Sequence, residues 1–169
     1  MKVLFLDIDG ILNNYNHDSY RKNHFLPGRK TPTYCQLNVD AFNLITAAHP
    51  DVRIVISSSW RITNSLPKMR RYLRNWGVKG GRIIDFTPSL GLLRGRGLEI
   101  EKWIKEHPKV TSVVVLDDET VWEMVTNDIA SIFVKASGWL GFCETDAQRA
   151  IDILNNPEQA YLKGLRDGK

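Results

Sequence analysis

Two aspartates near the start of the chain are the residues best suited to chemistry. Asp7 and Asp9 flank Ile8 and follow the apolar run 3–6 directly. If a strand continues through them, both carboxylates point to the same side. Like charges held that close are costly unless a cation lies between them, and Mg²⁺ suits a site with few carboxylates that also binds a phosphate oxygen. Gly10 then allows a turn that residues with a Cβ disfavour. An ordinary strand end with an Asx turn is the simpler alternative.

The elements that must position these acids are apolar runs typical of buried strands. The run 3–6 has no polar alternation, which indicates a strand in the middle of a parallel sheet. Further strands are predicted at 52–58, 82–86, 111–116 and 129–134. Helical patterns lie between them, at 38–49 with Asn38 as the cap, 65–76, 98–107, a short stretch near 121–126, and from Thr145 to Pro157. We therefore predict an α/β fold, a central parallel sheet of about five strands with helices on both faces, and a frayed end from Gly164.

Polar residues follow two of the other predicted strands. Ser57 and Ser58 end the second strand, and Asp117 and Asp118 follow the fourth. In an open α/β sheet the carboxyl ends of the strands meet at one edge, where ligands bind. The serines could merely end a strand, and the two acids could cap a helix. Their common position nevertheless predicts one site with Asp7.

The spacing of these residues resembles that of a known superfamily. The stretch Val3–Gly10, read as strand-Asp-x-Asp-Gly, is similar to the first motif of the haloacid dehalogenase (HAD) superfamily. Ser58 matches the second motif, with Ser57 as the register alternative. The acidic pair after the fourth strand matches the fourth motif. The resemblance covers nearly the whole chain and implies a HAD-like Rossmannoid fold, in one domain over residues 1–169.

The third motif of that superfamily is a Lys or Arg at the start of a later helix. Arg96 is the best match, although the superfamily more often has Lys, and Arg94 is close enough to be an alternative. A closer resemblance is to the HAD domains of Swiss Army Knife RNA repair proteins, which resemble the phosphatase halves of polynucleotide kinase-phosphatases. It is carried by the stretches 58–61, 96–104 and 116–119.

The resemblance implies a phosphomonoester hydrolase and a role for each residue. Asp7 would be the nucleophile that forms an aspartyl-phosphate, and Asp9 the general acid and base. Mg²⁺ would be held by Asp7, the Asp9 backbone carbonyl and Asp117 or Asp118. Ser58 would bind a phosphoryl oxygen and Arg96 would neutralise phosphoryl charge. Further residues expected at the substrate are Ser57, Gly10, Arg94 and Arg61. For Arg61, a strut to an acid at a strand end is the alternative.

Neither position at which HAD proteins insert a cap has enough residues for a lid domain. Residues 13–36 read as a flap or small insertion, and residues 86–96 as a short loop. An open site of this kind favours a phosphate at the end of a large molecule. Basic residues could bind its backbone, because the stretch from Trp60 to Arg82 inclusive contains seven Lys or Arg and no acid. The flap adds Arg21, Lys22, Arg29 and Lys30. A solvated basic surface is the alternative.

The expected substrate is therefore a terminal 3′-phosphate of DNA or RNA. The first alternative is a phosphatase of a small phosphoester such as a nucleotide, and the second is a non-catalytic phosphate-binding or interaction module. The costly pair Asp7 and Asp9 argues against the second alternative. No P-loop is present, so a kinase is not predicted.

The composition limits the classes of protein to which this chain can belong. The 169 residues, of which 43% are hydrophobic and 25% charged, are typical of a globular protein, and the net charge of +4 is mild. No apolar run approaches the ~20 residues of a membrane helix. Cys35 and Cys143 are isolated, which predicts neither a disulfide framework nor a zinc site and favours a cytoplasmic protein.

Overall fold

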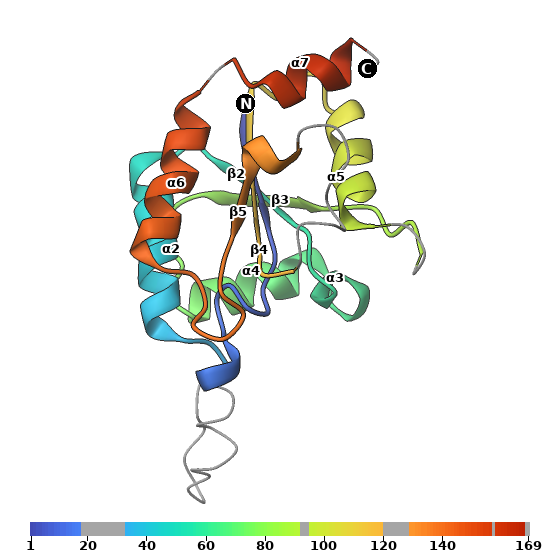
Figure 1. Cartoon of the computed structure of the whole chain (residues 1–169). Coiled ribbons are helices and arrows are strands. Elements are labelled where there is room, and N and C mark those ends of the chain that lie inside the picture. The colour runs from blue at the N-terminus through green and yellow to red at the C-terminus, as the bar shows by residue number, and fades with distance from the viewer. Residues whose placement is uncertain (18–32, 92–94, 120–128, 157, 168–169) are drawn as a thin grey trace, which may run out of the picture.

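The computed structural model describes the whole chain except residues 18–32, 92–94, 120–128, 157 and 168–169. Its centre is one parallel sheet of five strands (Figure 1). The strands are β1 (Lys2–Leu6), β2 (Arg53–Ile56), β3 (Arg82–Phe86), β4 (Ser112–Asp117) and β5 (Phe133–Lys135). Their order is β3-β2-β1-β4-β5, so the strand before Asp7 lies in the middle. The predicted α/β fold is confirmed.

Helices cover both faces of this sheet, as predicted. The helices are α2 (Gln36–Ala48), α3 (Trp60–Thr63), α4 (Leu66–Asn75), α5 (Arg96–Lys105), α6 (Glu144–Asn155) and α7 (Ala160–Arg166). Alternation along β1 separates two cores. Leu4 and Leu6 share one core with the apolar sides of α2, α4 and α6. Val3 and Phe5 share the other with α5 and α7 (Figure 1).

Three local predictions were wrong. Asn38 does not cap the first helix, because α2 begins at Gln36 after Cys35. The amide of Asn38 is instead buried and donates hydrogen bonds to the carbonyls of Leu140, at 3.1 Å, and Phe142, at 2.8 Å. The expected strand 129–134 begins as the 3₁₀ helix η2 (Ile129–Ile132), and β5 starts only at Phe133. The predicted fraying from Gly164 is wrong as far as Arg166, because α7 continues to that residue and buries three large side chains. These are Tyr161, Leu162 and Leu165.

Other predictions lie outside the described residues. They concern Arg94, the four flap cations in 18–32 and the short helix near 121–126. Among the described parts of the chain, no helix has the length and apolar content to cross a membrane.

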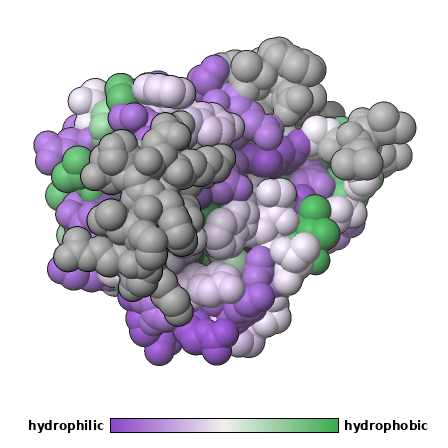
Figure 2. Space-filling view, turned by 90° about the horizontal axis from the view of Figure 1, so that it is seen from below, coloured by the Kyte–Doolittle hydropathy of each residue, from purple (hydrophilic) through white to green (hydrophobic). Residues whose placement is uncertain are grey.

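The parallel ladder continues just past the strands and so aligns the residues that follow them. The Asp7 N–H donates to the Leu116 carbonyl at 3.0 Å, and the Ser57 N–H donates to the Leu6 carbonyl at 2.8 Å. Residues after β1, β2 and β4 therefore lie at one edge of the sheet. This edge, at the bottom of Figure 1, faces the viewer in Figure 2, where purple hydrophilic residues and pale residues of intermediate hydropathy cover most of what is not grey.

Candidate active site

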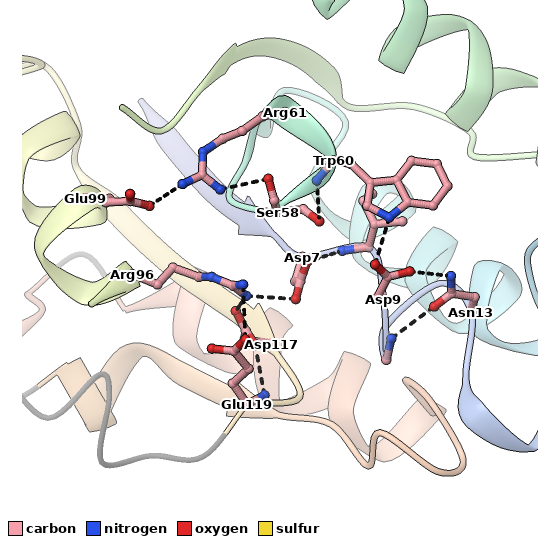
Figure 3. A network of polar contacts seen from close by, with 12 residues as sticks. Asp7, Asp9, Asn13, Ser58, Trp60, Arg61, Arg96, Glu99, Asp117 and Glu119 are labelled. Atoms are coloured by element: carbon pink, nitrogen blue, oxygen red, sulfur yellow. Dashed lines mark hydrogen bonds and ion pairs between the residues drawn. The ribbon is translucent and has the colours of Figure 1, made fainter. Parts of the chain in front are cut away.

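One guanidinium joins the acids at the carboxyl ends of β1 and β4 (Figure 3). Arg96 is the first residue of α5, and its Nη1 donates to Asp7 Oδ2 at 2.8 Å and to Asp117 Oδ2. Its Nη2 lies 3.3 Å from Glu119 Oε1. Asp7 is 4% exposed and Asp117 0%, so these charges have little water to stabilise them. The structure thus brings three of the predicted site residues into one buried ion cluster.

Burial changes the protonation of this cluster. It raises the pKa of Asp7, although Arg96 acts in the opposite direction. Burial and the adjacent charge of Asp7 together raise the pKa of Asp117 to about 7. Burial lowers the pKa of the Arg96 guanidinium, but the carboxylates of Asp7 and Asp117 outweigh it and hold that pKa above its usual range. The single positive charge of Arg96 therefore does not balance the negative charges of the carboxylates around it.

A third acid completes a set of possible metal ligands. Asp7, Asp117 and Asp118 each place a carboxylate oxygen within 4.8 Å of the others. The Asp118 carboxylate fits between two glycines, because a Cβ on Gly10 would lie 2.1 Å from Asp118 Cγ and one on Gly138 would lie 2.5 Å from Asp118 Oδ2. Gly10 also has a φ of 75°, which favours glycine. Three close carboxylates suit Mg²⁺. Which of Asp117 and Asp118 binds it directly stays a prediction.

Asp9 lies apart from this cluster. The strand ends at Leu6, so the expected alternation does not reach Asp9, and its carboxylate is exposed. Asp9 Oδ1 accepts a hydrogen bond from Asn13 Nδ2 and Asp9 Oδ2 one from Trp60 Nε1, each at 2.8 Å (Figure 3). Asn13 Oδ1 also accepts from the Gly10 N–H at 3.0 Å, which closes the turn. Since that N–H is bonded, substrate binding by Gly10 stays a prediction.

The two serines after β2 have different environments. Ser58 is fully buried, and its hydrogen bond to Asp7 acts to lower the pKa of that carboxyl. Ser58 Oγ also lies 3.4 Å from the Trp60 N–H. Ser57 is buried too, but its Oγ has no hydrogen-bond partner among the described residues. The structure therefore brings Ser58 beside Asp7, and a substrate contact of Ser57 stays a prediction.

Comparison with known proteins identifies the family to which this geometry belongs. The family described as "HAD domain in Swiss Army Knife RNA repair proteins" matches residues 3–147. The chain belongs to this HAD family. Curated proteins and solved structures gave no significant match. The resemblance drawn from the sequence motifs is confirmed, and the family generally has hydrolase or phosphatase activity.

Arg61 forms a strut inside this HAD domain. Its Nη1 donates to the Ser58 carbonyl at 2.7 Å, and its Nη2 donates to Glu99 Oε2. The other Glu99 oxygen accepts from the Leu90 N–H at 3.0 Å. The side chains of Arg61 and Glu99 are only 10% and 6% exposed. These bonds agree with the alternative that Arg61 is a strut, but the acidic partner, Glu99, lies on the helix α5 and not at a strand end as predicted. A contact of Arg61 with substrate stays a prediction.

Three residues of the HAD domain site carry interactions that sequence reasoning did not assign. Glu99 anchors Arg61, while Asn13 and Trp60 hold Asp9. The position of Glu99, three residues after Arg96 on the same helix, would have indicated a pair with Arg96 and not the observed bond to Arg61. The Trp60 ring packs edge-on against Trp76, with centroids 5.5 Å apart, and so lies partly buried against the core. Nothing in its spacing indicated the bond to Asp9.

Proposed function

We propose that this HAD domain is a Mg²⁺-dependent phosphomonoester hydrolase that works through an aspartyl-phosphate and removes a terminal 3′-phosphate from a polynucleotide. The observation that carries the proposal is the Arg96 bridge between Asp7 and Asp117, with Asp118 beside them. Such an arrangement offers a nucleophile, a fixed cation and ligands for a metal ion at one point.

In this reaction an Asp7 oxygen attacks phosphorus and the bond to the leaving oxygen breaks. Asp9 gives its proton to that oxygen, then removes a proton from the water that hydrolyses the acyl-phosphate. Arg96 and Ser58 stabilise charge on the phosphoryl oxygens. Bound Mg²⁺, held by Asp7, the Asp9 backbone carbonyl and Asp117 or Asp118, would supply further charge neutralisation.

A basic surface on α4 and β3 supports a polyanionic substrate. A pocket of about 330 Å³ there is lined by Arg70, Arg74 and Arg82. Arg70 Nε donates to the Ile83 carbonyl at 2.9 Å, whereas Arg74 and Arg82 are exposed and form no salt bridge with any described residue. Cations that lack acidic partners are available to backbone phosphates. The family's occurrence in RNA repair proteins supports the same substrate class.

Phosphate release from a substrate panel tests this proposal. The panel contains oligonucleotides with a 3′- or 5′-phosphate, mononucleotides and an aryl phosphate, each with Mg²⁺ or EDTA. We expect the highest kcat/KM with the 3′-phosphorylated oligonucleotide and none with EDTA. Asp7→Asn should lower every rate by more than about a thousandfold. The control Asp152→Asn, on the exposed side of α6, should not. Faster turnover of mononucleotides than of any oligonucleotide would favour the small-phosphoester alternative.

A further inference from the structure

Two exposed aromatic side chains lie on neighbouring segments beside the acids. Tyr15 and Trp139 are each 58% exposed, and the adjacent Leu140 is 64% exposed. Single exposed apolar residues are common on protein surfaces and need no explanation. Here, however, two large rings come from segments far apart in the sequence that meet at one place. Their function is therefore not explained by the hydrophobic core.

Backbone hydrogen bonds hold these two segments together. The Tyr15 N–H donates to the Gly138 carbonyl at 3.0 Å, and the Asn16 N–H donates to the Trp139 carbonyl at 3.2 Å. The side chain of Asn14 adds a bond to the Leu140 carbonyl at 3.0 Å. Trp139 also lies in a tight turn closed by the bridge between Ser137 and Gly141. Both rings are thus presented by fixed backbone, which lowers the entropy lost when a ligand binds.

Gly138 brings the Tyr15 ring next to the carboxylate of Asp118. A Cβ built on Gly138 would lie 3.0 Å from Tyr15 Cε2 and 2.5 Å from Asp118 Oδ2. The Tyr15 ring and the Asp118 carboxylate are therefore separated only by a glycine. The pKa of the Tyr15 hydroxyl agrees, because the charge of Asp118, with burial and the charges of Asp9 and Asp7, raises it. A group attached to a phosphate at Asp7 would lie beside the Tyr15 ring, and the backbone of Trp139 is bonded to the segment that carries this ring.

We propose that Tyr15 and Trp139 form a stacking platform for the base of the nucleotide that carries the scissile phosphate. Aromatic faces stack with every nucleobase, so the platform would bind the terminal nucleotide with little sequence preference. This inference rests on the proposed function, because it requires a nucleotide substrate.

Removal of the base provides the test. The substrates are a 3′-phosphorylated oligonucleotide and the same strand with an abasic sugar under the terminal phosphate. The wild-type protein should hydrolyse the normal strand with a kcat/KM about 5- to 100-fold higher. Trp139→Ala and Tyr15→Ala should lose most of this preference by slowing the normal strand alone. Trp139→Phe should keep it, because a ring remains. Ile62→Ala, which removes an exposed side chain of α3, serves as the control and should keep it as well.

The possible outcomes separate the inference from the proposed function. If the wild-type protein hydrolyses both strands equally, or if Trp139→Ala slows both by the same factor, the platform is refuted and the phosphatase proposal stands. If neither strand is hydrolysed while an aryl phosphate is, the polynucleotide substrate is refuted and the platform with it. The melting temperature of each variant is measured as well. A value near that of the wild type shows that the variant is folded, so that a lost preference for the normal strand is not caused by unfolding.

Discussion

Neutralising Glu99 should destabilise the protein strongly, because it would leave the Arg61 guanidinium buried without its counter-charge. Removing one partner of a buried ion pair costs about 3–5 kcal/mol. Arg61 is only 10% exposed, so water would replace little of the lost interaction. For a protein of this size each kcal/mol lowers the melting temperature by about 2–4 °C, so Glu99→Gln should lower it by about 6–20 °C. The amide oxygen of the new side chain could still accept from the Leu90 N–H, so the change isolates the charge.

A second ion pair on the same helix provides the control. Lys102 and Glu106 of α5 and its C-cap are about half exposed, at 48% and 53%. Glu106→Gln should change stability by no more than about 0.5 kcal/mol. Thermal melting monitored by circular dichroism compares the two variants. If Glu99→Gln melts within 2 °C of Glu106→Gln, on the order of the error of such scans, the Arg61–Glu99 pair is not a structural strut.

A double variant separates the strut from a substrate clamp. Arg61→Met with Glu99→Leu removes both charges and should recover most of the lost stability. If Arg61 is only a strut, this variant should hydrolyse an aryl phosphate with nearly the wild-type KM. A recovered melting temperature with a much higher KM would instead assign Arg61 to substrate binding. This would contradict the structural reading of its bonds to Ser58 and Glu99.

Three further predictions follow from the site and its surroundings. Asp9→Asn should lower hydrolysis of a sugar phosphate far more than hydrolysis of an activated aryl phosphate, because only the poor leaving group needs a proton; equal losses in steady-state rates would argue that Asp9 is not the acid. Without Mg²⁺ the raised pKa of Asp117, about 7, means that stability is lost as pH rises through that value. Saturating Mg²⁺ should therefore raise the melting temperature by about 5–11 °C at pH 8 and by much less at pH 5.5, where protons compete with the metal; an equal rise at both pH values would refute this linkage. Replacing Arg74 and Arg82 by Gln should flatten the log–log salt dependence of oligonucleotide KM by about 0.7 for each backbone phosphate that is no longer neutralised, with aryl phosphate kinetics unchanged; parallel changes for both substrates would mean that the basic surface does not bind the strand.

The buried strands were predictable because each is marked by an apolar run in its own sequence. Uninterrupted apolar runs before Asp7, Ser57 and Asp117 identified three neighbouring strands, and the common edge followed from parallel topology. The run at 129–134 looked similar, yet its first four residues form a 3₁₀ helix. Periodicity cannot separate short buried elements of different type, since both bury apolar residues over a few positions.

The bonds around Asp9 could not be predicted, because they depend on turns rather than on periodic elements. Asn13 and Trp60 reach the same carboxylate from different segments, and neither has a spacing that indicates it. The register of Ser57 and Ser58 was open for a related reason. A one-residue shift exchanges the faces of a strand, so only the structure shows that Ser58 lies beside Asp7.

The central position of β1 has a consequence for synthesis of the protein. Asp7 is made early, but Arg96 follows 89 positions later and the pairing partner β4 later still. Pairing between such distant segments is slow, because the chain between them must be ordered before the contacts form. Since β2 can pair with only one edge of β1, a growing chain displays the other edge of this apolar strand unpaired until β4 has left the ribosome. The nascent protein should be a strong client of chaperones, and a ribosome stalled before Asp117 should carry a chain without phosphatase chemistry.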